Sequence, residues 1–149
     1  MNPVGVSAEA ASILLSVFVL AALTATMLLW MYATRLPAMK RAGLGPQAAA
    51  HVADLRGRLP DSAERVADNY NHLTEAPTVF YAVALGVVAL GAADPIHAAC
   101  AWTYVGLRVV HSLVQATINR VALRFILFSL SWLTLIVMIG RALATALAL

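Results

Sequence analysis

The sequence predicts an all-α integral membrane protein, folded as a bundle of four helices. Of its 149 residues, 62% are hydrophobic and 11% are charged, and its mean hydropathy is +0.83. A soluble domain of this length could not bury so much apolar surface, so part of its solvent must be lipid. The apolar residues also form four long stretches, and roughly 20 such residues let a helix cross a hydrocarbon core about 30 Å thick.

The first apolar stretch predicts a membrane helix over about residues 10–33. It lacks the features of a signal peptide, because no basic residue precedes it and its apolar core is too long. We therefore expect it to remain in the protein as the first helix of the bundle.

A segment that breaks regular structure follows, over residues 34–60. It contains residues that stop helices and strands, namely Pro37, Gly43, Gly45, Pro46, Gly57 and Pro60. Pro46 stands at a first-turn position and Gly57 at a C-terminal position, so we expect a short helix between them.

The second helix is expected to be long, over about residues 61–93. Asp61 is the predicted N-cap, and Glu64, three residues later, completes a capping box. At 1.5 Å per residue this helix would be about 50 Å long, roughly four turns more than the hydrocarbon core needs. Its polar first part would therefore stand outside the membrane. Pro77, which cannot donate to the carbonyl of Leu73, should kink it.

The third and fourth helices are predicted over about residues 96–119 and 124–146. Because the connections before and after residues 96–119 are short, the helices that they join should be antiparallel neighbours. All four helices then form one domain over residues 1–149. Arg141 is expected to reach an interface near the end of the last helix, and Cys100, the single cysteine, is interpreted as a small packing residue.

The basic residues predict how the chain is oriented in the membrane. The net charge is +3, from ten Lys and Arg against seven Asp and Glu. Eight of the ten lie between the first two helices (Arg35, Lys40, Arg41, Arg56, Arg58 and Arg65) or between the last two (Arg120 and Arg124). The positive-inside rule makes this side cytoplasmic and both termini extracytoplasmic. This clustering explains the basic balance without nucleic acid, which we do not expect as a partner.

A polar stripe runs along the third helix. Its members, at steps of 4, 3, 4 and 4 residues on one face, are Tyr104, Arg108, His111, Gln115 and Asn119. A charge facing lipid at Arg108, near mid-span, would cost at least about 2.5 to 3.5 kcal/mol. The stripe should therefore face the interior of the bundle or a hydrated cavity.

A second polar face lies on the outer part of the second helix, where Arg65, Asp68, His72 and Glu75 recur at steps of three or four residues. Together with the stripe it predicts a pocket that opens toward the cytoplasm. Such a pocket suits a small zwitterionic or anionic molecule, and its apolar walls would admit a lipophilic partner from the bilayer. No metal is expected, because neither His72 nor His111 has a His or Cys partner at ligand spacing.

Structural roles are an alternative for the same residues. Arg108 and Glu75 could form an interhelical ion pair that fixes the register of two helices. Arg120 and Arg124 could serve only to set the topology and to contact lipid headgroups.

Two motifs resemble those of a known family. One is the Arg, Asn, Glu and Pro at the start of the second helix (Arg65, Asn69 or Asn71, Glu75 and Pro77), and the other is the Arg-x-x-His of the third helix with two later arginines (Arg108, His111, Arg120 and Arg124). The family is MAPEG, the membrane-associated proteins in eicosanoid and glutathione metabolism, which includes microsomal glutathione transferases and microsomal prostaglandin E synthase. The similarity covers the length, the four helices and both motifs, and the start of the second helix is similar to a bacterial branch.

The resemblance implies a homotrimer in a bacterial inner membrane, with glutathione bound between neighbouring subunits. By matching position, the residues that would hold the tripeptide are Arg65, Asn71, Glu75, His111 and Arg124, with Gln115 and Arg120 beside them. Arg108 would lie deeper, and Arg108 and Arg124 would be the catalytic residues. Guanidinium groups suit the carboxylates, Glu75 suits the ammonium group, and cationic neighbours favour the nucleophilic thiolate.

Two hypotheses for function follow. The first is a glutathione-dependent transferase or peroxidase that acts on lipophilic electrophiles by thiolate attack. The second is a non-catalytic accessory subunit of a larger membrane complex, or a lipid-binding protein with the same fold. Gln115, where several enzymes of the family have Tyr, and Asp68, where they tend to have a basic residue, favour the second. The Arg, His and Glu residues of both motifs together favour the first.

Overall fold

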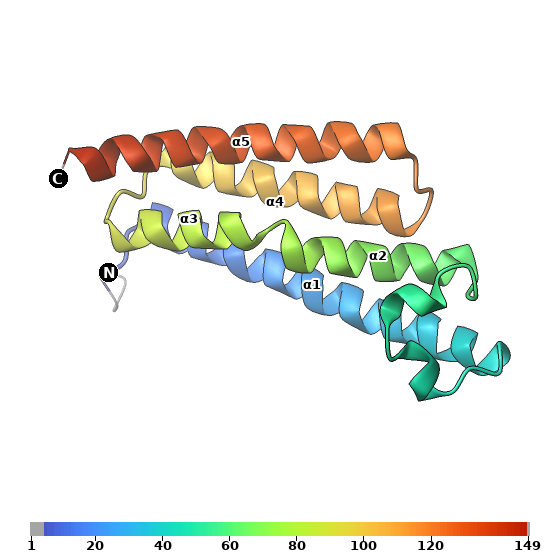
Figure 1. Ribbon diagram of the computed structural model, residues 1–149. Helices are drawn as coiled ribbons and strands as arrows, with labels where there is room; N and C mark the ends of the chain where they lie inside the picture. Colours follow the sequence, from blue (N-terminus) through green and yellow to red (C-terminus); the bar gives the residue numbers. More distant parts are fainter. Residues whose placement is uncertain (1–4, 149) are drawn as a thin grey trace.

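The computed structural model of the protein describes residues 5–148, and within them every regular element is helical. The α-helices are α1 (Ala8–Arg41), α2 (Asp61–Glu75), α3 (Thr78–Ala89), α4 (Pro95–Ala116) and α5 (Val121–Leu147). In Figure 1, α2 and α3 continue along one line, so together they occupy one position of a four-helix bundle. The predicted all-α four-helix bundle is therefore confirmed.

The first helix is longer than the sequence predicted, because α1 ends at Arg41 and not near residue 33. Pro37 lies inside it, where it removes one backbone hydrogen bond. The turn beyond Pro37 belongs to a small apolar cluster, which consists of Ala38, Met39, Leu55, Leu59 and Ala63. Burial of this turn compensates for the lost hydrogen bond, so the helix continues past the proline.

The segment between α1 and α2 contains two 3₁₀ turns, Pro46–Ala49 and Val52–Leu55, in place of the predicted short helix. Each turn is only four residues long, as is usual for 3₁₀ structure. Figure 1 shows the segment folded against the end of α1 and the start of α2, at the same end of the bundle as the α4–α5 connection.

The second predicted helix is interrupted at Pro77. α2 ends at Glu75, and α3 ends at Ala89, whereas one continuous helix was predicted to residue 93. Pro77 has no N–H to donate to the preceding turn and becomes the N-cap residue of α3. Gly91, with a φ of 65°, takes the left-handed conformation that commonly ends a helix. The helix is therefore interrupted at the predicted position, Pro77, and one continuous helix over residues 61–93 is wrong.

The predicted capping box at the start of α2 is also wrong. Pro60 is the N-cap residue, and no side-chain hydrogen bond caps this helix within the described structure. The carboxylate of Glu64 instead accepts a hydrogen bond from the N–H of Gly57, at 2.7 Å. Asp61 pairs with Nε of Arg65 at 3.1 Å. Neither carboxylate therefore accepts a hydrogen bond from the backbone N–H groups of the first turn of α2.

The last two helices run antiparallel and pack on one another more extensively than any other pair (Figure 1). α4 ends at Ala116, before the predicted end near residue 119. Asn119 has a φ of 50°, a left-handed conformation that a right-handed helix cannot include. The chain reverses at this point, and α5 begins at Val121.

Within residues 5–148, three parts are long and apolar enough to cross a membrane, namely Ala8–Arg41, Asp61–Ala89 and Val121–Leu147. The fourth predicted span, α4, does not meet this test of length and composition. Its polar stripe lowers its hydropathy, because Arg108, His111 and Gln115 all lie within it. Figure 1 shows that α4 nevertheless runs alongside α5, which is one of the three apolar parts.

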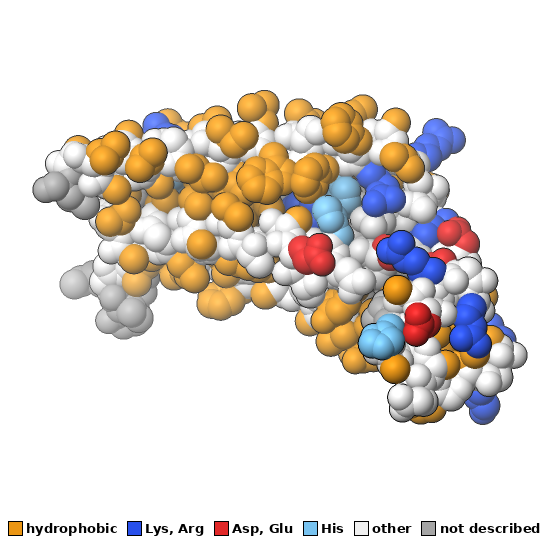
Figure 2. All heavy atoms as spheres, viewed as in Figure 1, with side chains coloured by type: hydrophobic (Ala, Val, Ile, Leu, Met, Phe, Trp, Pro, Cys, Tyr) orange, Lys and Arg blue, Asp and Glu red, His pale blue; other side chains and the backbone are white. Residues whose placement is uncertain are grey.

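The outer surface of the bundle is apolar. Phe18 is 65% exposed, Leu29 70% and Phe125 69%, and Figure 2 shows hydrophobic side chains along the length of the bundle. Lys and Arg gather at the end that carries the segment between α1 and α2 (Figure 2). An apolar surface of this extent needs lipid or another subunit to cover it.

Candidate functional site

The polar stripe of α4 faces the interior of the bundle, as its spacing predicts. Tyr104, Arg108, His111 and Gln115 are all buried, and Arg108 is 0% exposed. The ring of Tyr104 stacks on Phe80 of α3, with 4.5 Å between the ring centroids. The stripe therefore begins in the apolar core. It becomes more polar toward the end of the bundle where Lys and Arg gather, which we call the basic end.

Among the described residues, Arg108 contacts a histidine and no carboxylate. Its Nη1 lies 3.2 Å from Nε2 of His72, on α2. Because a guanidinium nitrogen only donates, Nε2 of His72 must accept, which leaves this imidazole neutral with its proton on Nδ1. Nε and Nη2 of Arg108 are buried without a partner among residues 5–148. Glu75 is exposed and forms no ion pair with Arg108 in this part of the chain, so the alternative of an interhelical ion pair is not supported.

His111 connects α4 to the start of α5. Its Nδ1 lies 3.1 Å from the backbone carbonyl oxygen of Arg124, and its Nε2 lies 3.1 Å from Oε1 of Gln115. Both oxygens only accept, so both contacts are hydrogen bonds when the imidazole carries two protons, or when the amide of Gln115 is turned to bring its NH₂ group to Nε2 of a neutral ring. The rings of His111 and His72 are stacked, with centroids 5.0 Å apart. These contacts fix the orientation of both imidazoles.

A cavity of about 220 Å³ lies against the two histidines. Arg124, Phe125 and Phe128 of α5 line its other side. Nη1 of Arg124 donates to the side-chain oxygen of Asn119 at 2.7 Å, whereas its Nε is buried and has no partner within the described residues. The cavity is thus bordered by an arginine with unused hydrogen-bonding capacity.

The structure separates the predicted site residues into two groups. Arg108, His111, Gln115 and Arg124 lie at or directly behind the cavity. The other four, Arg65, Asn71, Glu75 and Arg120, do not line it. Among these, Asn71, Glu75 and Arg120 are exposed.

Arg65 and Asn71 have other neighbours. Arg65 donates to the backbone carbonyl of Thr117 and so attaches α2 to the end of α4. Asn71 lines a separate cavity of about 420 Å³. Arg35 and Arg56 line that cavity as well.

Sequence reasoning missed two contributors to the site, His72 and Phe128. His72 was placed on a polar face but assigned no role, although it is the partner of Arg108. Phe128 lies 5.4 Å from the ring of His72, and no sequence signal separated it from other apolar residues of α5. Asn69, the alternative to Asn71 in the first motif, is 0% exposed, and its side-chain oxygen and nitrogen lack partners within residues 5–148.

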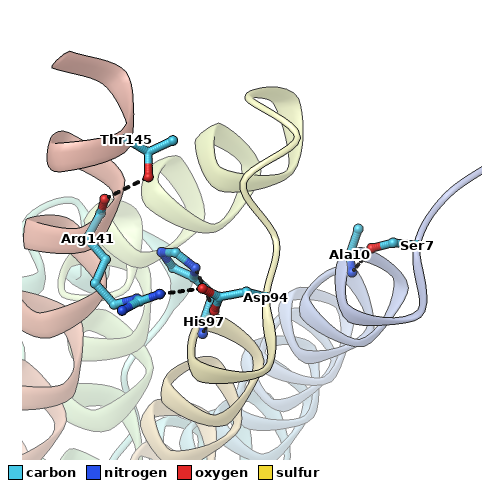
Figure 3. A network of polar contacts seen from close by, with 6 residues as sticks. All are labelled: Ser7, Ala10, Asp94, His97, Arg141 and Thr145. Carbon is cyan, nitrogen blue, oxygen red and sulfur yellow. Dashed lines mark hydrogen bonds and ion pairs between the residues drawn. The ribbon is translucent and has the colours of Figure 1, made fainter. Parts of the chain in front are cut away.

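A separate polar network lies at the opposite end of the bundle (Figure 3). Asp94, the N-cap of α4, accepts hydrogen bonds from the N–H of His97 at 2.8 Å and from Nδ1 of the same residue at 3.0 Å. Arg141 of α5 pairs with the other oxygen of this carboxylate, rather than simply reaching an interface as expected. The His97 N–H holds the pKa of Asp94 below its usual value, against the opposing effect of burial, and Arg141 lowers this pKa further.

An apolar helical bundle with arginines and histidines gathered between its helices, Arg108 and His111 among them buried, defines an integral membrane protein with a polar site inside it. The sequence profile of the MAPEG family matches residues 13–144, so the chain belongs to the MAPEG family, and the predicted membership is confirmed. No curated protein and no solved structure matches the chain.

Proposed function

We propose that the protein is a glutathione-dependent transferase or peroxidase that acts on lipophilic electrophiles within the membrane. The observation that carries the proposal is Arg108, which is fully buried behind the cavity and has two guanidinium nitrogens without partners among the described residues. A buried cation without a carboxylate is costly, and intramembrane charges are usually functional. An anionic ligand would compensate it.

The residues at the cavity fit an anionic ligand such as glutathione. Arg108 and Arg124 both have unused N–H groups, and guanidinium groups bind anionic oxygens strongly. The cavity in one chain, about 220 Å³, is smaller than the roughly 300 to 1,000 Å³ of small-molecule sites. We therefore propose that a neighbouring subunit completes the site in a homotrimer, where exposed Asn71 and Glu75 could also take part.

Each group then has a definite role. Arg65, Arg120 and Arg124 would hold carboxylates, and Glu75 would hold the ammonium group. Glutathione would supply a thiol, whose thiolate form is the nucleophile. Arg108 would stabilise that negative charge from behind the cavity, while His72 keeps the guanidinium in place. His111 and Gln115 would fix the wall between Arg108 and the basic end.

The lipophilic substrate would enter from the bilayer, past α5. Phe125 lines the cavity and is 69% exposed on the outer surface of the bundle. Phe128 lies next to it along the same wall. The cavity is therefore bordered by arginine on one side and by lipid-facing aromatic rings on the other, as a reaction between a polar thiol and an apolar electrophile requires.

A non-catalytic accessory subunit is the second candidate. The contact of Gln115 with His111 favours it, because this histidine already has partners at both ring nitrogens. In that case the polar groups between α2, α4 and α5 would serve only to align the helices.

Calorimetric titration of the purified protein with glutathione tests the proposal, followed by turnover with a lipophilic aryl halide and with a lipid hydroperoxide. Saturable binding and turnover of either substrate are expected. A matched control is Arg41→Gln, which removes a basic residue at the same end of the bundle but outside the cavity. Binding without turnover of any electrophile would favour the accessory role, and the absence of binding would refute the proposal.

A further inference from the structure

A groove lies on the outside of α1, apart from the cavity proposed for glutathione. Its volume is about 460 Å³, within the range of small-molecule sites. Met31, Leu36 and Met39 of α1 form one side, and Leu44 and Pro46 of the following segment form the other. The floor of the groove is therefore apolar and is built from two parts of the chain.

Two cations border this apolar groove. Arg35 and Lys40 both line it, and neither forms an ion pair with a carboxylate within residues 5–148. Lys40 is exposed and Arg35 is partly exposed. An apolar groove with uncompensated positive charge at its rim suits an amphiphile with a negatively charged head.

The position of the groove along α1 matches the boundary of a bilayer. Residues 10–34 carry no charge, a stretch that is about 38 Å long in a helix, compared with about 30 Å for the hydrocarbon core. Arg35 therefore lies at the level of the headgroups. Met31 lies about one turn deeper, so the groove runs from the hydrocarbon region into the headgroup layer.

We propose that this groove binds an anionic phospholipid of the surrounding leaflet. An acyl chain would pass Met31 toward the hydrocarbon core, the phosphate would lie between Arg35 and Lys40, and Leu36 and Met39 would contact the glycerol part of the lipid. The lipid would contact both α1 and the segment after it, so it would hold these two parts together. Its binding should then stabilise the folded protein in proportion to lipid concentration.

The test compares binding of phosphatidylglycerol and phosphatidylcholine to delipidated protein in a neutral detergent, by native mass spectrometry and thermal shift. Wild type should bind phosphatidylglycerol in preference, with a higher melting temperature. The double variant Arg35→Gln and Lys40→Gln should bind it about 30-fold more weakly, which corresponds to about 2 kcal/mol for two cations at the membrane surface. The matched control, Arg41→Gln with Arg58→Gln, changes the net charge equally at exposed residues outside the groove and should bind as wild type does.

A second variant separates the groove from its charges. Ala49→Trp should fill the apolar part, where Ala49 is a lining residue, and should weaken binding while both cations remain. Equal affinity of the double variant and its control, equal affinity for the two lipids, or unchanged binding by Ala49→Trp would each overturn the proposal. If neither variant folds, the salt dependence of wild type decides. Binding that does not weaken between about 50 mM and about 500 mM salt would exclude an anionic head at these cations.

Discussion

At the scale of single residues, Arg108 is a buried charge that is not part of an ion pair among the described residues. The guanidinium is fully buried, yet its partner is the neutral imidazole of His72 and not an acid. Removing this arginine would therefore leave no carboxylate unpaired inside the bundle. The usual penalty of about 3 to 5 kcal/mol for breaking a buried ion pair should not apply.

We predict that Arg108→Leu keeps the fold and the oligomer but weakens thiolate formation. Without this cation the bound thiol of glutathione should lose its proton only at higher pH, because cationic neighbours favour the thiolate. The thiolate absorbance near the ultraviolet edge, titrated in the presence of glutathione, measures the change. A variant that loses its oligomer, and regains it when Glu75→Gln is added, would instead give Arg108 a structural role.

Glu75 is a residue whose role can be tested with little risk to the fold, because it is exposed. Glu75→Gln should leave the melting temperature unchanged and weaken glutathione binding about tenfold or more, since losing a hydrogen bond to a charged group costs about 1.5 to 3 kcal/mol. Calorimetry measures the affinity. Asp54→Asn, at another exposed acid, is the control and should bind normally. Equal affinity of wild type and Glu75→Gln would show that Glu75 is not a ligand.

At the scale of elements, α2 and α4 are joined by polar contacts at two levels. Near the basic end, Arg65 donates to the carbonyl of Thr117, and deeper in the bundle His72 accepts from Arg108. Asn69 lies between Arg65 and His72 along α2, and so at a level between these two contacts. Both amide atoms of Asn69 lack partners among the described residues, which marks this level as a polar place inside the bundle.

At the opposite end, Asp94 joins α4 to α5 through Arg141. The pKa of Asp94 is lowered in the folded protein, chiefly by the His97 N–H. A lowered pKa contributes stability above the unfolded value, about 3.9, and this stability is lost as the pH falls through the folded value. The effect should be modest, because both side chains are about one third exposed.

We therefore predict that Asp94→Asn flattens the acid limb of the stability curve. Asn is a good N-cap residue, so the variant keeps the start of α4 and removes only the charge. Thermal unfolding in detergent from about pH 7 to about pH 3 measures the melting temperature of both proteins as a function of pH. Below about pH 4 the melting temperature of wild type should fall further than that of the variant. Parallel curves would show that the Asp94 charge contributes nothing to stability.

At the scale of the whole molecule, charge and hydropathy are arranged along one axis. The basic end holds the connections between α1 and α2 and between α4 and α5, and the start of α1 and the end of α5 lie at the other end (Figure 1). Exposed apolar side chains cover the length between them. This arrangement supports an orientation with the basic end in the cytoplasm.

We predict that both termini are extracytoplasmic. Reporter fusions at each terminus, of one kind active only in the cytoplasm and another active only outside it, would measure the orientation. A cytoplasmic signal at the C-terminus would refute the prediction.

Native mass spectrometry of the purified protein should show three copies. The cavity of one chain is too small for the proposed ligand, and we propose that a neighbouring subunit of a homotrimer completes the site.

The sequence by itself determined the membrane environment, the presence of four helical positions in the bundle, though not the exact ends of the helices, and the inward face of α4. These depend on local quantities, namely hydropathy summed over a span and the 3.6-residue period that places Arg108 and His111 on one side. The tertiary structure decided the partners. That Arg108 meets His72, while Glu75 on the same helix as His72 stays outside, depends on how α2 is rotated against α4. Contacts of α2 with α1 and α4, which join residues far apart in the sequence, hold that rotation, and no local pattern of the sequence encodes them.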